Sequence, residues 1–272
     1  MNGDTKSGGS SDVVRLDVAA IGESALTLAE ELLELILGSI EGDVAIHRLT
    51  VCSLLVGLQH ARGSIAEFSA DRPYSGLALD RCFYESVVRI MERNLDVDYA
   101  RRIWKLLPIL AAEEEARKIE ERLVTRKGVV QKPISTSAMP PGVLRDVKTY
   151  MDEHPDLSGE ERSMKQAEDY VWQAVNSDDA HRDRTVHYDI PSLFVHCRPL
   201  IAEDVIDIGD PEDWKLRETS RVGEANARIL DIAALLINLC RFLAPRFGYD
   251  VSPVDLVQVK WLEALENHRS GM

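Results

Sequence analysis

A short basic segment in the C-terminal half of the chain holds the residue types best suited to chemistry. Residues 181–198 contain three of the seven histidines and three arginines: His181, His187, His196, Arg182, Arg184 and Arg198. Histidine titrates near neutral pH and is the side chain most often used in general acid–base catalysis. Arginine binds phosphate through paired hydrogen bonds. The segment therefore indicates proton transfer beside a phosphate, and the alternative is a solvated loop whose charges pair locally.

The six residues from Arg182 to His187 read Arg-Asp-Arg-Thr-Val-His. This order resembles the Arg-(Asn/Asp/His)-x-x-x-His signature of the HEPN superfamily of helical ribonucleases and defence toxins. The resemblance implies that the arginine and the histidine of two protomers meet across a dimer interface and cleave RNA without a metal ion. It implies that His187 transfers a proton at the ribose 2′-oxygen or the leaving oxygen, and that Arg182 stabilises the phosphorane charge. Asp183 would orient one of them, with support from His196.

Two further segments are similar to a bacterial helical family known only as a domain of unknown function. The first reads Arg-Cys-Phe-Tyr-Glu from Arg81 to Glu85. The second, from Tyr188 to His196, is close to that family's Tyr-x-x-Leu-Ser-x-x-Val-His pattern, with Pro191 where the family has leucine. Both resemblances imply a compact helical bundle, so they agree on the fold.

Arg81 and Glu85 are four residues apart and therefore share one helix face. Two interpretations stay open for them. In one, they meet Tyr188 and His196 in a polar pocket between helices, and Arg184 is a further binding residue. In the other, they form a partly buried ion pair, and His196 is a core histidine whose polar atoms are satisfied.

A metal site built from His181, His187 and His196 is a third interpretation of the basic segment. However, the chain lacks the GxGxxG, GxxxxGK[ST], HExxH and GxSxG motifs. The cysteines are far apart and are expected to be reduced thiols: Cys52, Cys82, Cys197 and Cys240. We therefore expect no metal and no cofactor.

The net charge of −14 argues against a protein that coats nucleic acid non-specifically, because such binding requires neutralised phosphates. Binding of RNA at a local basic site is compatible with this net charge. The longest apolar run, around residues 230–240, is too short for a membrane span. Residues 1–12 are polar and lack the apolar core of a signal peptide. We expect a cytoplasmic protein with no membrane contact.

Helical apolar periodicity, with only 16 glycines and 11 prolines, predicts an all-α fold. We expect a helical bundle of about eight to ten helices in two packed lobes. Residues 1–12 would form a disordered tail, 13–127 the N-terminal lobe, 128–142 a linker and 143–272 the C-terminal lobe.

The predicted helices are placed by their apolar stripes and by their capping signals. They cover Val13–Leu37 with a break near Gly22, Asp43–Ser69, Tyr74–Asn94, a segment from Val97, Ala111–Lys127, Val143–His154, Ser158–Asn176, Pro191–Val195, Glu218–Phe247 and Val254–Asn267. Residues 177–185 are expected to be irregular.

Two functions from different classes follow. The first is a metal-independent HEPN-like ribonuclease, a toxin or phage-defence effector, acting as a homodimer through Arg182 and His187. It requires that His187→Ala abolish RNA cleavage while the fold is retained. The second is a non-enzymatic helical module that binds a protein partner or a nucleotide, with the histidines serving structure. A protein inert toward RNA would favour the second.

Overall fold

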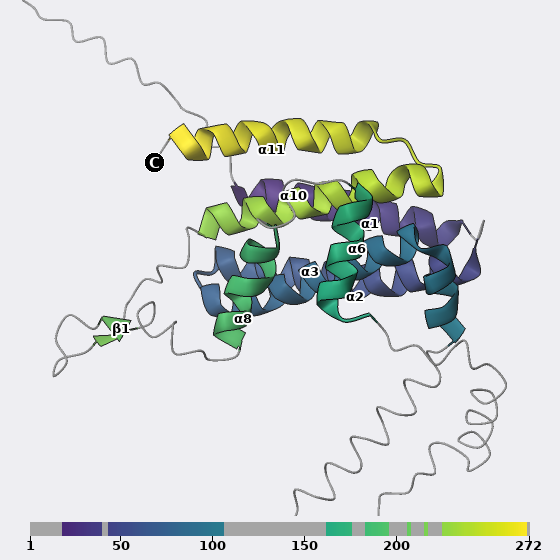
Figure 1. Ribbon diagram of the computed structural model, residues 1–272. Helices are drawn as coiled ribbons and strands as arrows, with labels where there is room; N and C mark the ends of the chain where they lie inside the picture. The colour runs from purple at the N-terminus through teal and green to yellow at the C-terminus, as the bar shows by residue number, and fades with distance from the viewer. Residues whose placement is uncertain are drawn as a thin grey trace, which may run out of the picture. The chain divides into compact units, whose positions relative to one another are not determined.

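The computed structural model describes residues 18–39, 43–105, 162–175, 183–195, 206–207, 215–216 and 225–270. Nearly all of them are helical, which confirms the all-α fold class (Figure 1). The helices are α1 Val18–Gly38, α2 Val44–Ser69, α3 Pro73–Leu95, α6 Met164–Val175, α8 Ile190–Val195, α10 Ala225–Leu243 and α11 Ser252–Ser270. Residues 97–105 are also helical. The 1–12 tail, the 128–142 linker and the helices predicted over 111–127 and 143–154 lie outside the described residues.

Three short elements complete the described secondary structure. A π-helical turn, η3, covers Thr185–Asp189, and a 3-10 turn, η5, covers Ala244–Phe247. The two-residue strands β1, Ile206–Asp207, and β2, Lys215–Leu216, pair antiparallel.

The chain divides into two compact units whose segments alternate along the sequence. The first unit comprises residues 1–38, 55–87 and 181–272, and the second comprises 39–54 and 88–180. Both α2 and α3 therefore contribute residues to each unit. The two lobes expected from the sequence are instead consecutive along the chain. Because the linker between them lies outside the described residues, that division stays a prediction.

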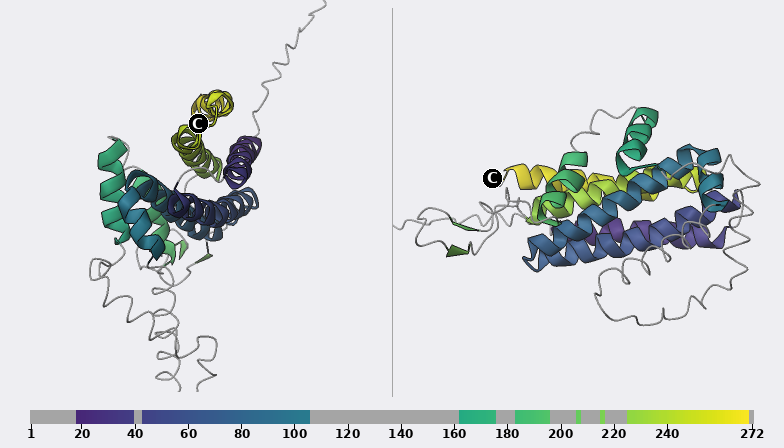
Figure 2. Two further views of the ribbon diagram at one scale, coloured as in Figure 1. Left: turned by 90° about the vertical axis from the view of Figure 1, so that its right-hand side faces the viewer. Right: turned by 60° about the horizontal axis from the view of Figure 1, so that its bottom comes forward.

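In the first unit, α1 packs against α10 and α11 (Figure 2). The apolar stripe of α1 is buried: Ala25, Leu28, Ala29, Leu32, Leu33 and Ile36. Fully buried residues of α10, including Ile232 and Leu236, belong to the same unit's core. Burial of such side chains contributes about 1.5–3 kcal/mol each.

The break predicted near Gly22 is wrong, because α1 runs through this residue without interruption. A side chain at position 22 would place its Cβ 2.9 Å from Ile229 Cγ2 and 3.2 Å from Ile65 Cδ1. The glycine is therefore a point of close helix contact and not a helix breaker.

The connections around α2 follow the sequence closely. Asp43 caps the helix, since its Oδ1 accepts hydrogen bonds from the backbone N–H of Ala45 at 2.9 Å and of Ile46 at 3.3 Å. The helix ends before Asp71, whose φ of 55° is left-handed. Pro73 then begins α3, as expected for a residue without a backbone donor.

The helix predicted from Ser158 begins at Met164 as α6, and a capping box precedes it. Ser158 lies outside the described residues. The reciprocal bonds are made by Ser163 and Gln166. Ser163 Oγ accepts from the Gln166 N–H at 3.3 Å, and Gln166 Oε1 accepts from the Ser163 N–H at 2.8 Å. The same S-x-x-E/Q pattern occurs twice within a few residues, and the second copy is the one that precedes the apolar face of the helix.

One more boundary differs from its prediction. The stretch expected to be irregular up to Thr185 is helical at residues 183–184 and continues into η3. The helix expected from Glu218 is described from Ala225 onward as α10, and residues 218–224 lie outside the described part of the chain.

By length and composition alone, α2 could cross a membrane. Its apolar residues Leu58, Ala61 and Ile65 are at most 5% exposed within the first unit. A core helix has this same composition, so the observation does not assign a membrane span.

Replacing Gly22 with valine should lower the unfolding free energy by about 1–3 kcal/mol, because the added carbons collide with Ile229. Urea denaturation of the full chain measures this. Gly38→Ala is the control: no atom of the described residues lies within 4 Å of its Cβ position, so a change within about 0.5 kcal/mol is expected. Equal effects of the two substitutions would contradict the close packing at Gly22.

Replacing Ser163 with alanine should cost about 1 kcal/mol of stability, because α6 loses its N-cap acceptor. Thermal denaturation of the variant is compared with that of Ser24→Ala. The Ser24 hydroxyl donates only to the Ala20 carbonyl inside α1, so its loss should be nearly neutral. If the two variants melt together, Ser163 does not cap α6.

Candidate functional site

His187 lies in η3 and is buried, with 3% of its surface exposed. Its Nδ1 is 2.8 Å from Oδ1 and 3.1 Å from Oδ2 of Asp80, a residue of α3 with no exposed surface. One turn along α3, the Tyr84 ring stacks against the imidazole at a centroid distance of 5.9 Å. The predicted proton-transfer residue is therefore held and oriented by a buried carboxylate.

Asp80 is not among the residues predicted from the sequence, although a signal for it is present. Asp80 falls three residues after Leu77 and four before Tyr84, in the middle of the buried stripe of α3. A buried carboxylate must find a hydrogen-bonding partner. The position of Asp80 therefore indicates a partner on another element. Only the fold identifies that partner as His187.

The environment of His187 favours its protonated form. Burial lowers the pKa of a histidine, but here the negative charge of Asp80 and its hydrogen bond outweigh that effect. Smaller contributions come from the charges of Asp231 and Asp183. The pKa of His187 is therefore raised above its ordinary value.

A second contact fixes η3 from the side of α10. Arg228, which is 7% exposed, donates a hydrogen bond from Nη1 to the carbonyl of Val186 at 2.8 Å. Backbone groups in a π-helical turn follow a wider pattern than in an α-helix, and such turns are frequent at functional sites. The backbone at Val186 is thus held by the charged guanidinium of Arg228.

The ring of Tyr188 lies near two arginines. The guanidinium carbon of Arg81 is 4.8 Å from the ring centroid, and that of Arg184 is 5.8 Å away. Arg81 Nε donates to Glu85 at 3.1 Å, and Arg184 Nε donates to Asp189 at 3.3 Å. We call these five residues the Tyr188 cluster.

The structure brings most, but not all, of the predicted residues together. The Tyr188 cluster contains the predicted binding residues Arg81, Glu85, Tyr188 and Arg184, and His187 is the next residue along η3. Arg182 and His196 lie outside the described residues. The pairing of Arg182 with His187 and the place of His196 in a pocket therefore stay predictions.

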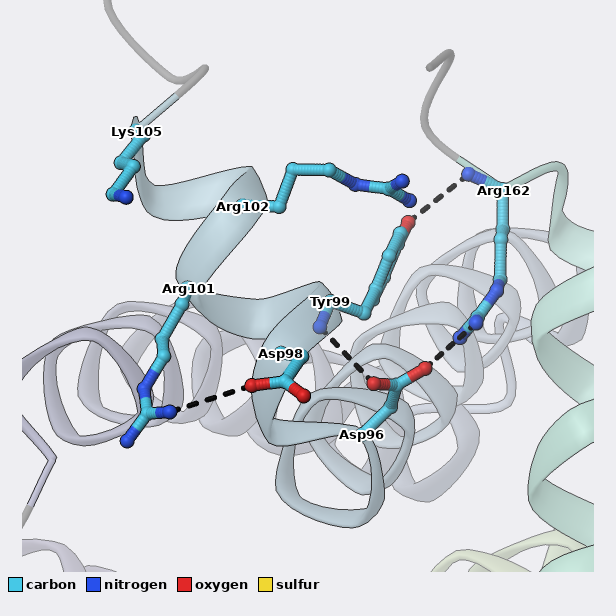
Figure 3. Close-up of a pocket in the computed structure, with 7 residues that line it drawn as sticks. All are labelled: Asp96, Asp98, Tyr99, Arg101, Arg102, Lys105 and Arg162. Carbon is cyan, nitrogen blue, oxygen red and sulfur yellow. Dashed lines mark hydrogen bonds and ion pairs between the residues drawn. The ribbon is translucent and has the colours of Figure 1, made fainter. Parts of the chain in front are cut away.

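A pocket of about 450 Å³ opens in the second unit (Figure 3). We call it the basic pocket. It is lined by Asp96, Asp98, Tyr99, Arg101, Arg102, Lys105 and Arg162. Four basic side chains face two acidic ones, in a chain whose net charge is −14. This pocket is not predicted from the sequence, since Arg162 comes from a distant segment of the chain.

Tyr99 is the fixed centre of the basic pocket. Its side chain is buried and lies between Arg102 and Arg162 in Figure 3, with guanidinium carbons 5.2 Å and 4.2 Å from the ring centroid. Its hydroxyl oxygen accepts a hydrogen bond from the Arg162 N–H at 3.0 Å. Both the ring and the hydroxyl are therefore engaged by the protein itself.

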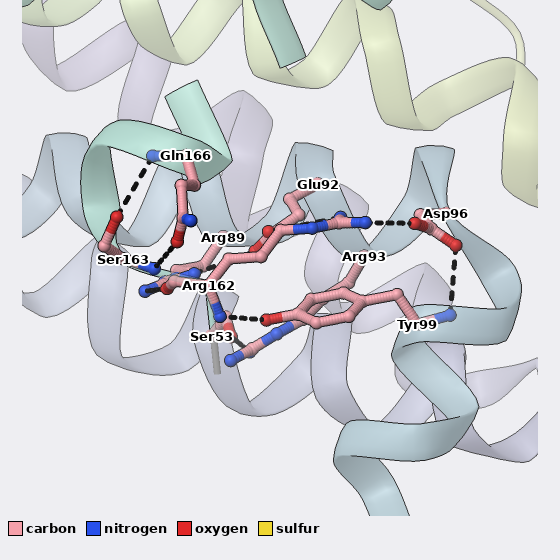
Figure 4. Close-up of polar contacts among 9 residues, drawn as sticks. All are labelled: Ser53, Arg89, Glu92, Arg93, Asp96, Tyr99, Arg162, Ser163 and Gln166. Atoms are coloured by element: carbon pink, nitrogen blue, oxygen red, sulfur yellow. Dashed lines mark hydrogen bonds and ion pairs between the residues drawn. The ribbon is translucent and has the colours of Figure 1, made fainter. Parts of the chain in front are cut away.

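Arg162 connects α6 to α3 by several charged contacts (Figure 4). Its Nη2 donates to Asp96 Oδ2 at 2.7 Å and its Nη1 to Glu92 Oε1 at 3.5 Å. Arg89 Nη2 donates to the Arg162 carbonyl at 2.7 Å. Although burial opposes both shifts, the hydrogen bond between Asp96 and Arg162 lowers the pKa of Asp96 and raises that of Arg162.

No protein-family model, curated protein or solved structure matches the chain. The HEPN resemblance therefore stays a prediction from a short motif. Within the described residues, no group of three or more His, Cys, Asp or Glu side chains could hold a metal ion. The metal interpretation names His181 and His196, which lie outside those residues.

The Asp80–His187 pair should make stability depend on pH. Because the folded pKa of His187 is raised above the unfolded value of about 6.5, the pair stabilises fully below that pH. Its contribution is lost as the pH rises through the folded pKa. Asp80→Asn should cost about 3 kcal/mol at pH 6, and this difference from wild type should shrink at higher pH.

Urea denaturation of both proteins from pH 6 to pH 9 provides the measurement. Asp98→Asn is the matched control, because this side chain is 94% exposed, and it should change the free energy of unfolding by less than about 0.5 kcal/mol. A gap between wild type and Asp80→Asn that widens as the pH rises would mean that His187 is neutral in the folded protein.

Proposed function

We propose that this chain is a HEPN-like, metal-independent ribonuclease in which His187 is the acid–base residue. The observation that supports this proposal most is the Nδ1 contact of 2.8 Å between His187 and Asp80. A carboxylate at Nδ1 orients an imidazole and stabilises its protonated form, as in other histidine-based hydrolytic sites. Asp80 is a positioning residue in this proposal, because it acts through His187.

The raised pKa of His187 favours proton donation over proton removal. In the proposed reaction, the ribose 2′-oxygen attacks phosphorus and its proton passes to solvent. The bond from phosphorus to the 5′-oxygen breaks, and His187 gives its proton to that leaving oxygen. Arg182 stabilises the negative charge of the phosphorane. The products are a 2′,3′-cyclic phosphate and a 5′-hydroxyl end, and solvent reprotonates His187.

The Tyr188 cluster supports an RNA substrate at the same place. Arg81 and Arg184 are 18% and 29% exposed in their side chains, so both can contact a phosphate while they stay near Tyr188. The HEPN resemblance implies a homodimer with Arg182 of one protomer facing His187 of the other. A role as a toxin or phage-defence effector belongs to the same proposal.

A second candidate is a non-enzymatic helical module that binds a protein or a nucleotide. One observation favours it: His187 is 3% exposed, so RNA reaches its imidazole only if neighbouring groups move aside. In this case the Asp80–His187 pair serves stability, as buried histidine–carboxylate pairs can.

RNA cleavage in the presence of EDTA distinguishes the two. We expect wild type to cleave and His187→Gln to be slower by about 100-fold or more, because general acid catalysis contributes about 10²–10⁴. His268→Gln, the matched control, should cleave like wild type. Circular dichroism checks that each variant is folded. Cleavage by His187→Gln at the wild-type rate would exclude His187 as the acid.

If His187→Gln fails to fold, the pH profile of the wild type serves instead. Cleavage by a protonated His187 should decline as the pH rises through the raised pKa. An absence of cleavage by the folded wild-type protein, across several structured and unstructured RNAs, would favour the binding module.

A further inference from the structure

Two basic side chains of the basic pocket make no ion pair with any residue that the structure describes. Arg162 is bound to Asp96 and Glu92, and Arg101 to Asp43 and Asp98. Arg102 makes no ion pair with any described residue, and its buried Nε has no hydrogen-bond partner among them.

Lys105 makes no ion pair with any described residue either, and it is exposed at the edge of the same pocket. A buried donor without a partner, such as the Nε of Arg102, costs about 1–3 kcal/mol unless a ligand or water satisfies it. Arg102 and Lys105 are therefore the groups of this pocket that a ligand would meet.

The acidic residues that line the pocket compensate these cations only in part, and the charge of Arg102 contributes to the lowered pKa of Asp96. Asp96 accepts from Arg162 at 2.7 Å and from the Tyr99 N–H at 3.0 Å, so its charge is used inside the network. Those bonds overcome its burial and lower its pKa, which keeps it ionised. Asp98 has a side chain that is 94% exposed and pairs with Arg101. The groups of the pocket that a ligand can contact, Arg102 and Lys105, are hydrogen-bond donors, and donors select an anion.

The geometry of Tyr99 further restricts the ligand. Two guanidiniums already lie against its ring, and its hydroxyl accepts a bond from Arg162. A nucleobase therefore finds no free ring of Tyr99 on which to stack. Because Tyr99 holds Arg102 in place, the guanidinium fork is oriented before a ligand arrives.

We propose that the basic pocket binds a small, polar phosphate monoester, with Arg102 as the principal phosphate ligand and Lys105 as a second contact. The volume of about 450 Å³ fits a small molecule. Arginine binds phosphate through two parallel bonds, and a dianion matches the excess of basic over acidic side chains. This site involves none of the residues proposed for RNA cleavage, so either proposal can fail alone.

Isothermal titration of the full chain at constant ionic strength tests the proposal. The probes are ribose 5-phosphate, ribose, inorganic phosphate and AMP. Ribose 5-phosphate should bind with a Kd of about 1 mM or tighter, and ribose should not bind. Inorganic phosphate should compete with ribose 5-phosphate. AMP should bind no more tightly than ribose 5-phosphate, because its base has no ring to stack on.

The variants locate the site. Arg102→Gln should weaken binding of ribose 5-phosphate by about tenfold or more, and Lys105→Gln by about threefold. Arg48→Gln is the matched control, because Arg48 lies 5.4 Å from the Trp104 ring centroid in the same unit but does not line the pocket. It should change the Kd by less than about twofold. Lys105 is exposed, so its substitution leaves the test valid even if Arg102→Gln does not fold.

Several results would overturn the proposal. One is an absence of binding of ribose 5-phosphate and phosphate by wild type at about 10 mM. Another is an equal loss of affinity in Arg48→Gln and Arg102→Gln, which would mean that overall charge and not this pocket governs binding. Binding of a 5′-phosphorylated RNA without binding of ribose 5-phosphate would assign the pocket to a nucleic acid. AMP binding at least tenfold tighter would assign it to a nucleotide.

Discussion

The first unit depends on the burial of one carboxylate. Asp80 has no exposed surface, and a charge in that position is tolerated only with a partner that carries the opposite charge or donates hydrogen bonds. His187 supplies both, and Tyr84 covers the imidazole. Arg228 binds the backbone of η3 at Val186. The turn that carries the candidate chemistry is thus attached to α3 by a side chain and to α10 through its backbone.

The second unit uses an arginine where the first uses a histidine. Arg162 binds Asp96 and Glu92, and it also contacts the ring and the hydroxyl of Tyr99. Arginine does not lose its charge at physiological pH, so this network should not respond to the pH changes that titrate His187. The two units therefore differ physically: one has a pair that can give up a proton, and the other has permanently charged donors of which Arg102 is left to bind a ligand.

Local signals predicted much of the helical structure, and long-range contacts explain what they missed. The predicted helix boundaries at Asp43 and Ser69 need only neighbouring residues, and both are confirmed. Gly22 was misread because its meaning depends on Ile229, which lies far along the chain. Likewise, His187 was recognised as a candidate, but Asp80 was not, because the contact joins residues 107 positions apart. The spacing of residues within one segment of the chain does not identify a partner that lies so far away in the sequence.

The charge of −14 and the two groups of arginines lead to one conclusion about recognition. A strongly acidic protein repels polyanions at long range, so neither site can rely on steering by the overall field. Near Tyr188 the charges of Arg81 and Arg184 are also partly compensated by Glu85 and Asp189. An anion must therefore be recognised through short-range, oriented hydrogen bonds. Arg102, which lies against the ring of Tyr99 and makes no ion pair with any described carboxylate, meets that requirement most fully.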